Sequence, residues 1–108
     1  MKKADVMIIA CPTAWIDTPR SESIGPVHNS MTPVDELDPA GITVALGTDN
    51  VCDAMVPWNG GDMWHELMTL ATGCRYDEME ALAKIATVNG RRVLGLPPLE
   101  NTDFSIQI

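Results

Sequence analysis

The sequence is poor in basic residues. Seven lysines and arginines stand against fifteen aspartates and glutamates, so the net charge is −8 when both histidines are neutral. A chain without a surplus of positive charge has no electrostatic means of holding a phosphate backbone or an anionic membrane surface. We therefore expect neither a nucleic acid nor a membrane as a partner.

Long hydrophobic stretches are also missing. Two lysines precede an apolar run at the start of the chain, but Asp5 interrupts this arrangement. The run over residues 6–11 is too short for the core of a signal peptide or for a membrane span. The sequence therefore predicts a cytoplasmic protein.

Cysteine is scarce and is not arranged in pairs. Cys11, Cys52 and Cys74 contain no Cys-x-x-Cys spacing, and an odd number leaves one thiol out of any disulfide scheme. We interpret all three as small, buried apolar residues.

The chain does contain enough apolar material for one core. Its 108 residues are 45% hydrophobic and 20% charged. This length and composition are typical of a single globular domain rather than of a disordered segment.

Two continuous apolar runs predict β-strands. Residues 6–11 and 42–48 are rich in β-branched side chains and do not alternate with polar residues, which is typical of parallel strands buried on both faces. The segment from Pro12 to Met31 has the composition of a long irregular loop. Thr32 is a suitable cap for a two-turn helix beginning at Pro33.

Helical patterns fill the second half of the chain. Asp62 is a good N-cap for a helix that ends near Gly73. Asp77 and Glu80 have the spacing of a capping box for the next helix, and a last short helix is expected over 88–94.

The order of these elements predicts an α/β fold with two parallel strands. Two such strands do not make a finished sheet, because both outer edges offer unpaired backbone groups. We therefore expect residues 1–96 to form a βαβα segment that self-associates or is completed by another polypeptide. Residues 97–108 are expected to be an extended tail.

Candidate functional residues gather after the predicted strands. Asp49 follows the second strand directly, where reactive groups collect in parallel α/β folds, although an aspartate there can also form an Asx turn. His28 lies in the loop after the first strand, either facing the same end or simply exposed. Trp15, Trp58 and Trp64 can wall a pocket for a planar substrate or serve as plain packing residues.

Several segments carry a more specific signal when they are taken in order. They are Ala-Cys-Pro-Thr-Ala-Trp at 10–15, His-Asn-Ser at 28–30, Pro-Val-Asp-Glu-Leu at 33–37, Ala-Gly-Ile-Thr-Val-Ala-Leu-Gly-Thr-Asp-Asn at 40–50, Ala-Thr-Val-Asn-Gly at 86–90 and Leu-Gly-Leu at 94–96. Together they resemble the C-terminal quarter of the amidohydrolase superfamily, in particular its cytosine deaminase-like branch.

The resemblance implies a partial (β/α)8 TIM barrel in which residues 6–11 and 42–48 are strands seven and eight. Members of the family hydrolyse C–N bonds of cyclic amides and amino-heterocycles with a divalent metal such as zinc or iron. Asp49 matches the family's eighth-strand aspartate, which binds the metal and acts as a base toward its water. Asn50 stands where cytosine deaminases typically carry a second aspartate, so the resemblance argues against cytosine itself as the substrate.

The family's histidine ligands have no counterparts here. The two histidines, His28 and His65, form no His-x-His motif, and Asp49 alone does not hold a catalytic metal. We expect the chain by itself to bind no metal and to show no turnover. Two functions stay open: a hydrolase fragment supplying Asp49 and the pocket residues His28, Asn50, Trp15 and Trp58, or a non-catalytic, self-associating domain that binds a small planar ligand.

Overall fold

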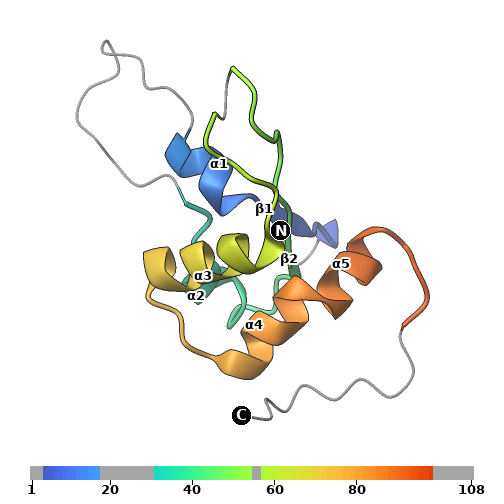
Figure 1. Ribbon diagram of the computed structural model, residues 1–108. Coiled ribbons are helices and arrows are strands. Elements are labelled where there is room, and N and C mark those ends of the chain that lie inside the picture. Colours follow the sequence, from blue (N-terminus) through green and yellow to red (C-terminus); the bar gives the residue numbers. More distant parts are fainter. Residues whose placement is uncertain (1–3, 18–30, 55–56, 99–108) are drawn as a thin grey trace, which may run out of the picture.

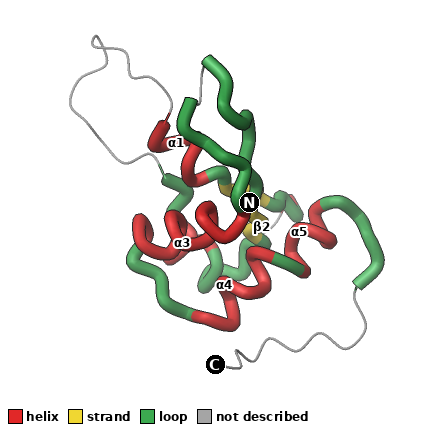
Figure 2. Tube along the Cα trace, in the orientation of Figure 1, coloured by secondary structure: helices red, strands yellow, loops and turns green. Residues whose placement is uncertain are grey.

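The computed structural model describes residues 4–17, 31–54 and 57–98. It is an α/β fold in which helices outweigh a very short sheet (Figures 1 and 2). In chain order the elements are β1 (Ile8–Ala10), α1 (Pro12–Asp17), α2 (Val34–Leu37), β2 (Val44–Leu46), α3 (Met63–Cys74), α4 (Met79–Ala86) and α5 (Val88–Val93).

The two strands form a parallel sheet. Ile8 lies opposite Val44, and Ala10 lies opposite Leu46. This confirms the prediction of two parallel strands, although each has three residues and is shorter than the apolar run that predicted it.

The core lies between the sheet and the helices. All three residues of β2 are buried, as predicted, but Ile9 in the middle of β1 is 54% exposed. The prediction that both strands are buried on both faces is therefore wrong for β1. The buried cluster consists of Ala10, Met31, Val34, Val44, Leu46, Leu70, Tyr76, Leu82 and Ile85.

Helix α1 occupies part of the segment that was expected to be an irregular loop. Pro12 is its first residue, a position where the missing N–H of proline costs nothing. The backbone N–H of Thr13 donates to the carboxylate of Glu66 at 2.9 Å. Because this partner lies 53 residues away, no local pattern shows that the helix start is stabilised.

The start of α2 differs slightly from the expectation. Pro33 rather than Thr32 is the N-cap, and no side chain caps the helix. Thr32 contributes its backbone carbonyl instead, which accepts hydrogen bonds from the Val34 N–H at 2.8 Å and from the Cys74 thiol at 3.1 Å. The thiol thereby ties α3 to the start of α2.

Helix α3 begins as predicted. The Asp62 carboxylate accepts a hydrogen bond from the Trp64 N–H at 2.9 Å, and the helix ends at Cys74, with Arg75 in the left-handed conformation. No helix in the described part of the chain is long and apolar enough to cross a membrane.

The expected capping box of α4 does not form. Glu78 is the N-cap and makes no side-chain cap hydrogen bond. Glu80 instead pairs with Lys84 one turn later at 2.9 Å, a spacing that favours such pairs in any helix. Helix α5 lies where it was expected and is followed by Gly95 with φ +70°.

The interpretation of the cysteines is corrected in part. Cys52 is exposed, and Cys11 and Cys74 are only half-buried. Burial raises the pKa of the Cys11 and Cys74 thiols above the ordinary value, so both favour the neutral form.

Tyr76 joins the end of α3 to the end of α2. Its hydroxyl donates to the Asp38 carboxylate at 2.6 Å. Burial raises the pKa of the phenol, and the hydrogen bond that the phenol donates to Asp38 raises it further. The folded protein therefore favours the neutral phenol more strongly than the unfolded chain does.

We expect Tyr76→Phe to lower the free energy of unfolding by about 1 kcal/mol near neutral pH, because it removes this hydrogen bond. In the wild type, the contribution of the raised pKa is fully present below the unfolded value of 10.0 and is lost as pH rises through the folded pKa. Urea titrations at neutral and alkaline pH check this. An alkaline loss of stability equally steep in Tyr76→Phe would contradict it.

Candidate functional site

The structure places four of the five predicted site residues at the carboxyl end of the parallel strands. Asp49, Asn50 and Trp58 belong to the loop after β2, and Trp15 belongs to α1 after β1. The loop and α1 extend toward the same end of the molecule (Figure 1). This confirms the expected position of Asp49, whereas His28 lies outside the described residues.

Asp49 has an unusual backbone conformation. Its φ is +61°, in the left-handed region that aspartate and asparagine tolerate better than most residues. Its Oδ1 atom accepts a hydrogen bond from the Asn50 N–H at 2.8 Å, yet the residue is exposed. The side chain thus makes a local turn contact while keeping its carboxylate accessible to solvent.

The two tryptophans at this end are not core residues. Trp15 is 55% exposed and Trp58 is 83% exposed. Asn50 is exposed as well. The described chain therefore presents these side chains on an open surface rather than in a closed pocket.

Asn59 holds the loop after β2 in shape. Its side chain is 1% exposed, and the amide nitrogen donates to the carbonyl of Thr48. Its Oδ1 accepts from the Gly61 N–H at 2.9 Å, and its backbone carbonyl accepts from the Cys52 N–H at 3.0 Å. Asn59 therefore fixes the ends of the loop that carries Asp49 and Trp58.

Glu66 holds the start of α1, which follows β1 directly. It is fully buried, and one carboxylate oxygen accepts the Thr13 N–H described above. Its other oxygen and the Thr13 hydroxyl are buried without a hydrogen-bond partner in the described part of the chain. The sequence signal for this residue was its position four residues before Leu70, on the buried stripe of α3.

Carboxylates from two separate elements act on the Cys11 thiol. Burial is the main cause of its raised pKa, and the Asp49 and Glu66 carboxylates both raise it further. Two carboxylates from separate elements are thus within interaction range of one thiol. This convergence places the end of β1, the loop after β2 and the start of α3 in one neighbourhood.

The described residues do not form a complete metal site. No group of three histidine, cysteine, aspartate or glutamate side chains among residues 4–17, 31–54 and 57–98 could hold a metal ion. A zinc or iron site generally needs at least three protein ligands. Among the described residues, Asp49 therefore has too few companion ligands for such a site.

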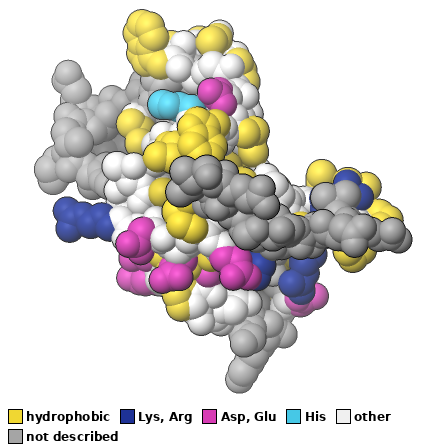
Figure 3. Space-filling model, turned by 60° about the horizontal axis from the view of Figure 1, so that its bottom comes forward, with side chains coloured by type: hydrophobic (Ala, Val, Ile, Leu, Met, Phe, Trp, Pro, Cys, Tyr) yellow, Lys and Arg dark blue, Asp and Glu magenta, His cyan; other side chains and the backbone are white. Residues whose placement is uncertain are grey.

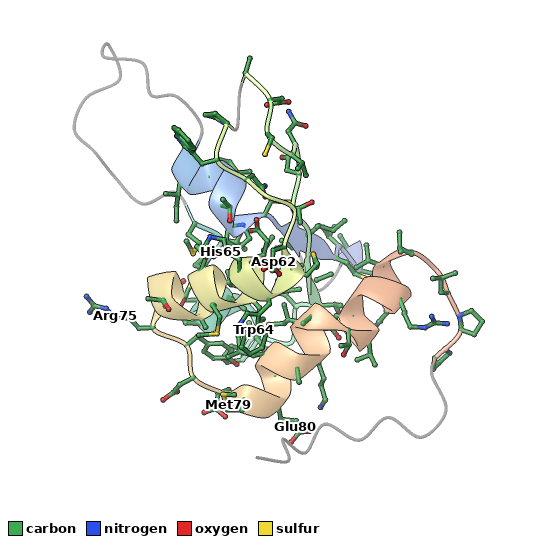
Figure 4. All side chains as sticks on the ribbon, viewed as in Figure 1. Asp62, Trp64, His65, Arg75, Met79 and Glu80 are labelled. Atoms are coloured by element: carbon green, nitrogen blue, oxygen red, sulfur yellow. The ribbon has the colours of Figure 1, made fainter. Side chains whose placement is uncertain are left out.

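A separate apolar groove lies between α3 and α4. It encloses about 720 Å³, and Trp64, Met68 and Met79 line it while remaining 66%, 46% and 54% exposed. Figure 4 shows Trp64 between the two helices, and in Figure 3 hydrophobic side chains lie exposed beside a row of acidic ones. Trp64, one of the three tryptophans considered as pocket walls, lines the groove, whereas the described site residues Asp49, Asn50, Trp15 and Trp58 do not.

The role of Asn59 can be tested through the exposed thiol of Cys52, whose Sγ donates to the Asn59 carbonyl at 3.2 Å. Asn59→Ala should loosen the loop and speed alkylation of Cys52, because a looser loop no longer holds the thiol against the backbone carbonyl of residue 59. Asn59→Asp keeps an acceptor for Gly61, removes the donor to Thr48 and adds a buried negative charge, so it should loosen the loop as well. Identical alkylation rates in all three proteins would show that Asn59 does not organise the loop.

Comparison with known protein families finds no family model that matches the chain. A stretch of 42 residues is 52% identical to an uncharacterized protein of Haemophilus influenzae, covering 39% of this chain and 93% of that protein. A stretch of 39 residues is 56% identical to another uncharacterized Haemophilus influenzae protein, covering 36% of this chain and 14% of that one.

Two solved structures of 5-methylcytosine deaminase from Klebsiella pneumoniae resemble the fold. The structure with 5-fluorocytosine has a TM-score of 0.70 at 29% identity, and the structure with phosphonocytosine has a TM-score of 0.73 at 28% identity. In both cases the match covers 87% of this chain but only 24% of the deaminase. The chain therefore belongs to the family of the short Haemophilus protein, and over most of its length it folds like a segment of 5-methylcytosine deaminase.

Proposed function

We propose that the chain is the C-terminal barrel segment of an amidohydrolase that acts on C–N bonds of cyclic amides or amino-heterocycles. The observation that carries the proposal is the combination of a deaminase match over 87% of the chain with an exposed carboxylate, Asp49, at the carboxyl end of β2. The segment supplies part of an active site rather than a complete one.

Asp49 is the catalytic group in this proposal. An exposed carboxylate fixed to a rigid strand end can take a proton from a nucleophilic water and return it to the leaving nitrogen. It also offers one ligand to a zinc or iron ion whose other ligands lie outside this chain. Bound by such a site, the metal would lower the pKa of a coordinated water.

The neighbouring residues bind the substrate in this proposal. The exposed faces of Trp15 and Trp58 suit a flat heterocycle. Asn50 and His28 supply hydrogen-bonding groups to its polar edge. Because the Asn50 amide both donates and accepts, we expect a preference for a ring other than cytosine.

A chimera tests the proposal. The chain replaces the matched quarter of the Klebsiella 5-methylcytosine deaminase, and two readouts are measured: ammonia release from 5-methylcytosine and related amino-heterocycles, and ring opening of cyclic amides. We expect turnover by the chimera and none by the isolated chain. A folded, metal-loaded chimera without turnover on any of these substrates would refute the proposal.

A second candidate is a non-catalytic domain that associates with itself. The observation in its favour is the apolar groove between α3 and α4, where Trp64 stands 66% exposed, because exposed patches of this kind often mark interfaces or ligand sites. Light scattering that shows a stable homo-oligomer, together with quenching of tryptophan fluorescence by planar heterocycles, would favour this function. A monomer without such quenching would exclude it.

A further inference from the structure

The apolar groove between α3 and α4 follows both helices for most of their length. Its lining residues on α3 recur at steps of three or four from Trp64 to Thr72, and those on α4 recur in the same way from Met79 to Ala86. Residues at such steps share one face of a helix. The groove therefore runs along about three turns of α3 and about two turns of α4, which suits a rod-shaped occupant.

The lining of the groove is apolar and adaptable. Trp64, Met68 and Met79 all remain largely exposed on it. Methionine side chains adjust to irregular partners because they are unbranched and flexible. In helix-in-groove recognition, an amphipathic helix inserts apolar residues spaced i, i+3, i+4 and i+7 into a groove of this kind. A helix with one apolar face therefore fits both the length and the chemistry of the groove.

Acidic side chains gather beside the groove around Tyr76. This residue lines the groove and also a neighbouring recess that contains Asp38, Glu78 and Glu80. Burial is the main cause of the raised pKa of its phenol, and the carboxylates of Asp38, Glu78 and Asp35 raise it further. Figure 3 shows the row of acidic side chains next to exposed hydrophobic ones. One edge of the groove is therefore negatively charged.

The described chain supplies little positive charge to offset this edge. Lys84 pairs with Glu80 at 2.9 Å. Arg75 lines one end of the groove together with Asp77, and its side chain extends outward in Figure 4. The whole chain carries a net charge of −8. An occupant with basic residues flanking its apolar face is therefore favoured by charge complementarity.

We propose that the α3–α4 groove is a docking site for a basic amphipathic helix of a partner protein. The apolar face of that helix covers Trp64, Met68 and Met79. Its lysines or arginines lie beside Asp38 and Glu78. The inference goes beyond the proposed function, because no residue assigned to the reaction lines the groove.

A second copy of this chain does not supply such a helix from its described part. There α5 is the only helix with a net positive charge, and its six residues make fewer than about two turns. Two copies of net charge −8 also repel each other. The occupant is therefore a different polypeptide.

The probe for the test is a synthetic peptide of about 14 residues, or roughly four helical turns. Leucines recur in it at helical spacing, and lysines fill the other positions. Binding to the full chain is measured by fluorescence anisotropy of the labelled peptide. We expect saturable binding, and binding at least about tenfold weaker for two matched peptides: one with the same composition but no helical apolar face, and one with glutamate in place of lysine. Equal binding of either matched peptide, or no binding of the lysine peptide, would overturn the proposal.

Variants of the chain locate the binding. Met79→Lys should weaken binding of the lysine peptide at least about tenfold, because it places a positive charge in the groove. Glu78→Gln should weaken binding about threefold or more in dilute salt, and less at physiological salt. Ile16→Lys and Asp53→Asn make the same kinds of change at exposed residues outside the groove, and should leave binding within about twofold. Equal weakening by Ile16→Lys and Met79→Lys would overturn the proposal.

Trp64 gives a readout in the unmodified groove. Bound peptide should shift its emission to the blue, because it covers an indole that is 66% exposed. Trp64→Phe should keep the anisotropy signal and lose this shift. An unchanged emission at saturating peptide would contradict docking in the groove. Peptide binding at least about tenfold tighter to a chain without residues 99–108 would assign the groove to the chain's own end, and a doubled mass that the peptide reverses would assign it to a second copy; either result would overturn the proposal.

Discussion

Glu66→Ala is expected to lower the free energy of unfolding by about 2 to 3 kcal/mol, because it leaves the buried Thr13 N–H without its acceptor and opens a cavity. Glu66 is fully buried and joins α3 to the start of α1. Denaturant unfolding at a fixed protein concentration, followed by circular dichroism, measures the loss.

Glu66→Gln is the matched control for this prediction. It keeps an oxygen that can accept the Thr13 N–H and removes only the charge, so it should cost clearly less than the alanine variant. If Glu66→Ala were as stable as the wild type, the hydrogen bond to Thr13 would not hold α1 in place.

Asp49→Asn in the deaminase chimera is expected to lower turnover by about a hundredfold or more, because it removes the proton-transfer group. The same change in the isolated chain should alter stability by no more than about 0.5 kcal/mol. Asparagine tolerates the left-handed backbone at this position, and its side-chain oxygen can still accept the Asn50 N–H. Turnover and unfolding curves therefore separate a catalytic role from a structural one.

Asp53→Asn is the control for that experiment, since it makes the same chemical change at another exposed aspartate of the loop. We expect Asp53→Asn to leave turnover within about twofold of the unmodified chimera, because Asp53 has no role in the proposed catalysis. A clear loss of stability in Asp49→Asn would instead identify Asp49 as a structural Asx turn.

The features predicted from the sequence are those that depend on local patterns. The apolar runs around Ile8 and Val44 indicated two parallel strands, and Asp62 indicated the start of α3. The position of Asp49 followed from the strand that precedes it. Each of these signals lies within a few residues of the feature that it predicts.

The features that were not predicted depend on long-range contacts. Helix α1 is stabilised by Glu66 from 53 residues away, and the shape of the loop after β2 depends on Asn59, which reaches back to Thr48 across 11 residues. Ile9 was expected to be buried because its strand is apolar, but a face is covered only if the chain supplies something to cover it. Its exposure shows that no other part of the described chain covers this face of β1.

The most direct test of the central claim is deamination by two separately produced chains. This chain is mixed with the Klebsiella deaminase that lacks its matched quarter, and ammonia release from 5-methylcytosine and related amino-heterocycles is measured with zinc or iron present. The account predicts turnover by the mixture, none by either chain alone, and a loss of that turnover with Asp49→Asn. A complex that forms, contains metal and remains inactive would contradict the claim that this chain completes an amidohydrolase active site.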